Sequence, residues 1–203
     1  MTSAKNIYVH CDELEKIPAL NKKNWLYEIE LLKKELKLNA TVLQVGCMDG
    51  TRISALLKER PDLKITGFDI DKQLLDLAAQ KFKQEGIKAA LLLGDITASL
   101  SLLKFDYVIC LSNTSGYIEK EEKAIENMKK LGKTVIISVY GEKFTDEIAW
   151  EYFSGLGLKI NDIKRNPFYF LDFGTVKRYT LGEIRKWTQN VKETNLGYFC
   201  VIE

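Results

Sequence analysis

Histidine and proline are scarce in this chain of 203 residues, which contains one histidine and three prolines. A single imidazole, that of His10, excludes a histidine-rich metal site. The position of His10 near one end favours a solvated side chain over a catalytic base. Cysteine is sparse as well, and the four cysteines lie far apart with no C-x-x-C pair. Three of them, Cys47, Cys110 and Cys200, fall in or beside apolar runs, which indicates buried reduced thiols.

Neither sign of charge is in excess, and long apolar runs are absent. The 30 basic and 28 acidic residues leave a formal charge of +2, so neither nucleic acid nor a membrane surface is expected as a partner. No apolar run reaches the roughly 18 residues of a membrane span, and the N-terminus has no apolar signal core. We therefore expect a cytoplasmic protein. A homodimer is one candidate assembly, and the sequence leaves the oligomeric state open.

The length predicts a single domain over residues 1–203, because a chain of this size can bury one substantial core. Within it, residues 1–40 are expected to form an N-terminal helical cap. Residues 164–180 hold many aromatic side chains and are expected to form an insertion. No internal repeat or linker divides the chain.

The segment Thr41–Leu57 predicts a strand, a tight turn and a helix. Thr41–Val45 is short, apolar and β-branched, as suits a strand buried on both faces of a parallel sheet. Gly46 and Gly50 bracket the turn, where a missing Cβ allows unusual dihedrals and the close approach of a ligand. Thr51 is expected to cap the following helix, whose first N–H groups favour an electron-rich ligand.

Apolar runs alternate with amphipathic stretches along the rest of the chain. Further strands are predicted at Lys64–Asp69, Ile87–Leu93, Phe105–Leu111, Thr134–Tyr140, Leu158–Ile163 and Leu196–Ile202. Helices are predicted at Asn21–Leu38, Asp71–Glu85, Thr97–Leu103, Glu119–Leu131, Thr145–Gly155 and Thr180–Gln189. Because helices follow the strands, parallel pairing with right-handed crossovers is expected.

An acidic residue, Asp69, closes the second strand about twenty residues after the glycine turn, where a nucleotide-binding α/β fold accepts hydrogen bonds from ribose hydroxyls. The chain resembles class I S-adenosylmethionine-dependent methyltransferases in four successive motifs, V-L-Q-V-G-C-M-D-G, G-F-D-I, L-G-D-I and F-D-Y-V-I-C-L-S-N. The resemblance implies an α/β fold with a Rossmann-like, seven-stranded, mostly parallel sheet and helices on both faces. It also implies that the last strand runs antiparallel, inserted between strands five and six.

The resemblance further implies S-adenosylmethionine as cofactor. The implied cofactor-binding residues are Gln44, Gly46, Cys47, Gly50, Asp69, Ile70, Asp95, Ile96, Leu111 and Ser112. The glycine turn would lie against the methionine part, Asp69 would bind the ribose, and Ile70 would pack on the adenine. Asp95 would contact the adenine amino group, and the end of the fourth strand would face the sulfonium.

Candidate catalytic residues follow the fourth and fifth strands, whose carboxyl ends border the ligand crevice of such a sheet. They are Asn113, Tyr117 and Tyr140. The stretch S-N-T-S-G-Y-I is similar to small-molecule N-methyltransferases, so a small acceptor is expected, with nitrogen slightly favoured over oxygen. No N-P-P-Y-like motif follows the fourth strand, which argues mildly against planar bases and glutamine amides as acceptors. A turn-forming role for Asn113 and packing roles for the tyrosines are the alternatives.

Two positions depart from the family. Gln44 stands where an acidic residue is usual, and so supplies no charge for the cofactor's ammonium group. Met48 stands where a glycine is usual, and a positive φ there would cost about 1 kcal/mol. The alternative function is therefore a catalytically inactive, methyltransferase-like binding or structural subunit. An NAD-dependent dehydrogenase is disfavoured, because G-C-M-D-G lacks the G-x-G-x-x-G spacing.

Overall fold

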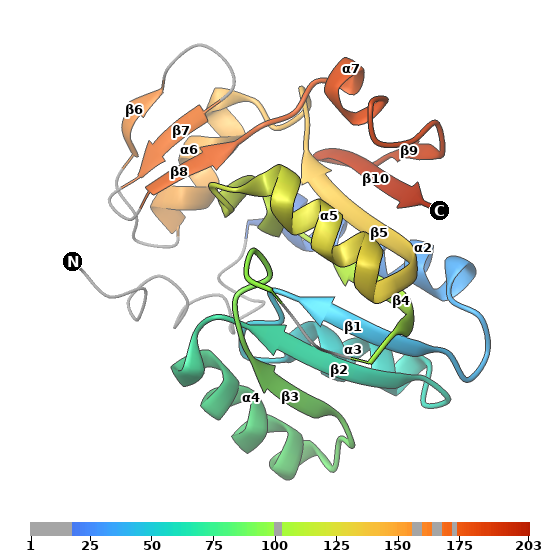
Figure 1. Ribbon diagram of the computed structural model, residues 1–203. Coiled ribbons are helices and arrows are strands. Elements are labelled where there is room, and N and C mark those ends of the chain that lie inside the picture. Colours follow the sequence, from blue (N-terminus) through green and yellow to red (C-terminus); the bar gives the residue numbers. More distant parts are fainter. Residues whose placement is uncertain (1–17, 100–102, 156–159, 164–167, 172–173) are drawn as a thin grey trace.

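The structure is a computed structural model that describes residues 18–99, 103–155, 160–163, 168–171 and 174–203 (Figure 1). Its main sheet has seven strands in the order β3-β2-β1-β4-β5-β10-β9. Their bounds are β1 Thr41–Val45, β2 Lys64–Asp69, β3 Ala90–Leu93, β4 Phe105–Cys110, β5 Gly132–Tyr140, β9 Val191–Glu193 and β10 Gly197–Ile202. The first five are parallel, and β10 runs antiparallel to both of its neighbours. The predicted fold class is confirmed.

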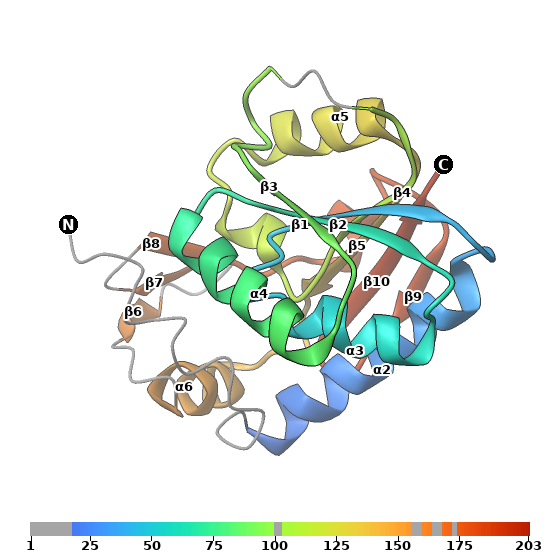
Figure 2. The same cartoon turned by 90° about the horizontal axis from the view of Figure 1, so that it is seen from below.

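Helices cover both faces of this sheet, as the edge-on view in Figure 2 shows. On one face lie α2 (Ala19–Glu35), α3 (Thr51–Glu59) and α4 (Lys72–Glu85); on the other lie α5 (Glu121–Leu131) and the short α7 (Leu181–Ile184). Side chains alternate between the faces along a strand. Val42 of β1 accordingly packs in the core beneath α2 and α3, whereas Leu43 packs in the core beneath α5.

β10 lies between β5 and β9. The position of β9 was predicted for a sixth strand at Leu158–Ile163. The described part of that segment, β6 (Ile160–Ile163), joins β7 (Phe168–Leu171) and β8 (Gly174–Lys177) in a separate antiparallel sheet of three strands. Only residues 164–167 separate β6 from β7. A connection that short joins antiparallel neighbours, whereas a parallel neighbour needs a crossover of a dozen residues or more.

The helix predicted at Thr97–Leu103 is wrong for the described residues of that segment. Residues 97–99 form a turn and a bend, while residues 100–102 lie outside the described residues. The cause is local, because the carboxylate of Asp95 accepts hydrogen bonds from the N–H and the hydroxyl of Thr97, both at 2.8 Å. Such side-chain bonds offer the backbone an alternative to the helix.

The last helix is shorter than predicted, because α7 ends at Ile184 and not at Gln189. Thr180 and Glu183 form a capping box that starts it. Beyond α7, the hydroxyl of Thr188 donates to the carbonyl of Val201 at 2.7 Å, so the chain is already held against β10.

The two ends of segment 141–178 lie side by side at the end of β5. The N–H of Tyr179 donates to the carbonyl of Tyr140, the last residue of β5, at 2.9 Å. Between these residues lie α6 (Asp146–Gly155) and the three-stranded sheet, beside one end of the main sheet (Figure 1). Parts of the aromatic insertion predicted at 164–180 fall within it, although residues 164–167 and 172–173 lie outside the described residues.

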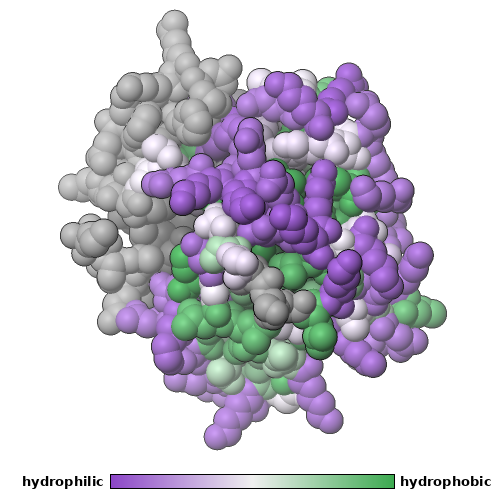
Figure 3. Space-filling model, in the orientation of Figure 1, coloured by the Kyte–Doolittle hydropathy of each residue, from purple (hydrophilic) through white to green (hydrophobic). Residues whose placement is uncertain are grey.

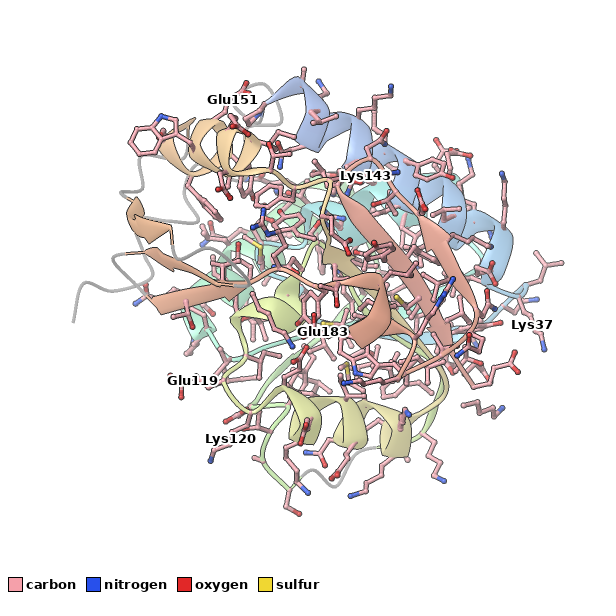
Figure 4. The ribbon with its side chains drawn as sticks, turned by 90° about the horizontal axis from the view of Figure 1, so that it is seen from above. Lys37, Glu119, Lys120, Lys143, Glu151 and Glu183 are labelled. Atoms are coloured by element: carbon pink, nitrogen blue, oxygen red, sulfur yellow. The ribbon has the colours of Figure 1, made fainter. Side chains whose placement is uncertain are left out.

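The surface carries dispersed charge. The side chains of Lys37, Lys120 and Glu151 point outward on different sides of the molecule (Figure 4). An apolar area lies over β2 and β3 in Figure 3, where the described part of the connection from β3 to β4 contains no helix. Within the ranges given above, no helix is both long and apolar enough to cross a membrane.

Arg60 holds the C-terminal end of α2 against the loop before β2. Its Nη1 donates to the carbonyl oxygens of Lys33 and Leu36, at 3.2 and 3.0 Å, and so satisfies groups that a helix end leaves unpaired. Asp62 accepts from Nε and Nη2 of Arg60, at 2.7 and 2.8 Å, and from the N–H of Asn39 at 2.9 Å. These bonds lower the pKa of Asp62, chiefly because the Arg60 guanidinium favours the charged carboxylate.

Candidate active site

The carboxyl ends of β1, β2, β4 and β5 meet at one edge of the main sheet. β1 lies between β2 and β4, so successive connections leave it toward opposite sides. In open α/β sheets, ligands bind in the crevice at such a switch point. The sequence motifs that follow these strands are therefore brought to one edge, as the resemblance implies.

Two glycines shape the turn after β1. Gly46 and Gly50 have φ angles of 68° and 78°, in the left-handed region where a Cβ is strained. A Cβ on Gly46 would lie 2.4 Å from Cγ2 of Thr114, and one on Gly50 would lie 2.6 Å from the ring of Phe82. Gly50 is also the N-cap of α3, so the capping role predicted for Thr51 is wrong. The N-cap lies one residue earlier than predicted because the residue with a left-handed backbone is Gly50.

Met48 and Asp69 join the turn to the end of β2. Met48 has a φ of 52°, which costs a non-glycine residue about 1 kcal/mol. Its N–H donates to Oδ2 of Asp69 at 2.8 Å, while Oδ1 of Asp69 accepts from the N–H of Asp71 at 3.0 Å. Asp69 is only 7% exposed, and burial raises its pKa. Asp69 thus fastens the glycine turn to the start of α4, and its ribose-binding role stays a prediction.

The residues predicted on the adenine side differ in exposure. Ile70 is 69% exposed at the end of β2, so its side chain is open to contact from solvent. Asp95 lies after β3 and holds the turn at Thr97. Ile96 is buried in the core beneath α5, and its carbonyl accepts from the side chain of Asn127 at 2.7 Å. Of the two predicted residues Asp95 and Ile96, only Asp95 keeps partial exposure.

Asn113 ties three segments together at the end of β4. Ser112 and Asn113 both have positive φ, 50° and 62°. The Asn113 side chain is fully buried, and its Nδ2 donates to the carbonyl of Lys177 at 2.9 Å, while its Oδ1 accepts from the N–H of Tyr140 at 3.0 Å. The nitrogen and the oxygen of this side-chain amide therefore each bind a backbone group, which gives Asn113 a structural role. Its predicted role toward the acceptor is not tested by this arrangement.

The two candidate tyrosines are the last residues of two elements near Asn113. Tyr117 ends a short 3-10 helix, η1 (Thr114–Tyr117), and is partly buried. Tyr140 ends β5 and is buried, with its ring stacked on Phe144 at a centroid distance of 4.0 Å. Their contact with an acceptor likewise stays a prediction.

Three predicted cofactor-binding residues, Gln44 in β1, Cys47 in the turn and Leu111 after β4, have buried side chains. Burial raises the pKa of the Cys47 thiol to about 12, so it is not a reactive thiolate. Gln44 is 2% exposed, and its Oε1 has no hydrogen-bond partner. A buried, unpaired carbonyl oxygen is rare, because it forfeits a hydrogen bond that water would have supplied. The residues described here contain no cluster of acidic, histidine or cysteine side chains fit to hold a metal ion.

Arg52 and Glu28 were not predicted as site residues. Arg52 lies on the first turn of α3, and its Nη1 is 2.7 Å from Oε2 of Glu28 on α2. Both side chains also contact the hydroxyl of Ser112, just after β4. One signal was present in the sequence: Glu28 stands within the helical stripe of Trp25, Ile29 and Leu32, where a core-facing acid is unusual.

Residues 43–134 match the sequence model of a family described as "Methyltransferase domain". The release factor glutamine methyltransferase of Streptococcus pneumoniae is 31% identical over 94 residues, which is 46% of this chain and 32% of that relative. The segments matched in the curated relatives cover 32% to 47% of those proteins' lengths. These matches confirm the resemblance to class I S-adenosylmethionine-dependent methyltransferases.

Solved structures support the fold over nearly the whole chain. The PH0226 protein from Pyrococcus horikoshii has a TM-score of 0.69 at 16% identity, covering 98% of this chain and 94% of that one. CalS10, an amino pentose methyltransferase from Micromonospora echinaspora solved with S-adenosylmethionine bound, has a TM-score of 0.60 at 14% identity, covering 90% and 92%. At these identities the likeness establishes a shared fold.

Proposed function

We propose that this protein is an enzyme that transfers a methyl group from S-adenosylmethionine to an acceptor. The observation that carries the proposal is the glycine turn at the switch point, with Gly46, Met48 and Gly50 all left-handed and the Met48 amide held by Asp69. This turn lies within the segment that matches the methyltransferase domain family.

The described residues fit the cofactor. The unpaired Oε1 of Gln44 is an acceptor without a donor, and such an atom suits an N–H group of a bound ligand or its water. The exposed Ile70 offers an apolar surface for a planar base. When bound, S-adenosylmethionine supplies an activated methyl group that an acceptor can displace in line. The protein then needs to orient the acceptor and exclude water, which requires no strong acid or base.

For the acceptor, we propose a small molecule, with a nitrogen nucleophile favoured over oxygen. The stretch Ser112–Ile118, which resembles that of small-molecule N-methyltransferases, follows β4 at the crevice edge. Asn113, Tyr117 and Tyr140 from this edge are proposed to border the acceptor, and the Asn113 side chain also holds the N–H of Tyr140. The missing N-P-P-Y-like motif argues against planar amide acceptors.

The test is isothermal titration of the purified chain with S-adenosylmethionine and S-adenosylhomocysteine. Mass spectrometry first establishes that neither molecule is already bound. We expect micromolar dissociation constants for both and no binding of NAD. A methyl-transfer screen of amines and alcohols with labelled cofactor then ranks the acceptors. If ligand-free protein binds neither molecule at millimolar concentration, the proposed function is wrong.

A second candidate is a methyltransferase-like subunit without activity. Two observations favour it: Gln44 carries no charge, and Met48 occupies a left-handed position. This candidate predicts a stable complex with a partner at fixed stoichiometry and no methyl transfer to any acceptor. Size-exclusion chromatography of the protein isolated from its source distinguishes the two.

A further inference from the structure

Arg52 and Glu28 form an ion pair of low exposure where β1 and β4 end. The two side chains are 20% and 2% exposed. Removing both charges from water costs free energy that their mutual attraction offsets only in part, and a well-packed apolar pair would often be as stable. The position of this pair therefore calls for an explanation other than stability.

The pair is held in place from several sides. Oε1 of Glu28 accepts from Nδ2 of Asn24 at 3.0 Å, and Oε2 lies 3.3 Å from the hydroxyl oxygen of Ser112. Nη2 of Arg52 contacts the same hydroxyl, and the guanidinium carbon lies 5.4 Å from the ring centroid of Trp25. Both charges are thus fixed in direction next to Ser112, the residue just after Leu111 and the end of β4.

Each member of the pair has capacity for a second partner. A guanidinium carries five N–H donors and a carboxylate offers about four acceptor positions. In the described bonds, Nη1 of Arg52 binds Glu28 and Nη2 binds Ser112. Asn24, Arg52 and Ser112 already occupy three acceptor positions of Glu28, so an oppositely charged pair would bind through its remaining position and through the donors of Arg52, which is the more exposed of the two. A zwitterion with an ammonium and a carboxylate on one carbon presents such a pair.

Gln44 lies on the same side of the sheet as this pair. Val42, two residues earlier on β1, packs in the core beneath α2 and α3, and residues two apart on a strand share a face. The unpaired Oε1 of Gln44 offers an acceptor but no charge. The charge missing from β1 is present instead on α2, in Glu28.

We propose that Arg52 and Glu28 bind an α-amino-acid head group, Arg52 holding the carboxylate and Glu28 the ammonium. In this chain, that head group belongs to the methionine part of the cofactor, so the proposal rests on the proposed function. The first turn of α3 adds to the attraction for the carboxylate, because the N-terminus of a helix carries partial positive charge. The pair replaces the acid that Gln44 lacks, and it explains a buried ion pair at this edge.

The test compares ligands with and without the head group on the full chain. S-Adenosylhomocysteine carries the group, whereas 5′-methylthioadenosine lacks it. The double variant Glu28→Gln with Arg52→Met removes both charges, so neither is left buried and alone. We expect its affinity for S-adenosylhomocysteine to fall about tenfold to hundredfold, and its affinity for 5′-methylthioadenosine to change less than about twofold. Binding of the second ligand also shows that the variant is folded.

Lys58→Met is the matched control, because it removes a charge from the same helix α3 at an exposed pair with Glu85. It should change neither affinity. Single variants separate the two roles. Arg52→Met should weaken S-adenosylmethionine but spare its decarboxylated form, whereas Glu28→Gln should weaken both, since both carry the ammonium.

Three outcomes would overturn the proposal. The double variant could bind S-adenosylhomocysteine as wild type does, or could lose both ligands equally. The single variants could also fail to distinguish the decarboxylated ligand. The proposed function itself is overturned if the wild-type protein binds neither S-adenosylhomocysteine nor 5′-methylthioadenosine. If the wild-type protein binds them and the variants bind them equally well, only the role of Arg52 and Glu28 is overturned.

Discussion

Replacing Asp69 by alanine is expected to loosen the glycine turn as well as to weaken cofactor binding. The carboxylate accepts one hydrogen bond from the amide of Met48 and one from that of Asp71. Hydrogen bonds to a charged group contribute roughly 1.5 to 3 kcal/mol each, and the cost of burying this carboxylate offsets part of the sum. We therefore expect the free energy of unfolding to fall by about 2 to 4 kcal/mol.

The assay is urea denaturation followed by circular dichroism, together with titration by S-adenosylhomocysteine. Asp69→Asn keeps one acceptor oxygen and should lose about half as much stability. Asp76→Ala is the control, because this carboxylate is exposed on α4 and pairs only locally with Lys72 in the described bonds, so a change within about 0.5 kcal/mol is expected. Affinity in Asp69→Ala should fall about tenfold or more. An unfolding curve and an affinity both equal to wild type would refute the reasoning.

Three further predictions concern Asp62, in the loop before β2, and Asn113 and Met48 at the candidate site. The pKa of Asp62 is lowered from its ordinary 3.8, so its contribution to stability is present above about pH 4 and is lost as pH falls through the lowered value. In urea denaturation from pH 6 to pH 2, the free energy of unfolding should therefore fall less in Asp62→Asn than in wild type. An equal fall in both proteins would contradict this. Asn113→Ala should lower the free energy of unfolding by about 2 to 4 kcal/mol, because two backbone groups lose their buried partner, and the same denaturation assay measures it. Met48→Gly should raise the melting temperature by a few degrees, because about 1 kcal/mol of left-handed strain is relieved, and an unchanged or lower value in thermal unfolding would show that the side chain of Met48 stabilises the turn.

The parallel half of the fold could be predicted from sequence because its signals are local. Thr41–Val45 and Lys64–Asp69 are short β-branched runs, and β1 and β2 begin and end at those residues. The glycine turn and Asp69 follow from the same local patterns. Met48 could be identified as strained only because a family pattern places a glycine there.

The other parts of the fold could not be predicted, because they depend on contacts between residues far apart in the sequence. Whether Ile160–Ile163 joins the main sheet or a separate one is decided by its partner, and β9 is too short at three residues to stand out beforehand. The same holds for the site. Glu28 and Arg52 are 24 residues apart, and their pairing required α2 to be packed against α3.

The closed neck between Tyr140 and Tyr179 has an evolutionary consequence. The N–H of Tyr179 bonds to the carbonyl of Tyr140, so the segment between these two residues is a loop whose ends are fixed at the main sheet. Each doubling of a loop's length adds only about 0.6 kcal/mol of closure entropy. β8 is tied to the main domain, because Lys177 accepts from Asn113 and pairs with Glu121. Insertions and deletions between α6 and β7 can therefore accumulate without altering the register of β5 with β10. Selection can thus change what reaches the crevice from this side while the strands that build it stay constant.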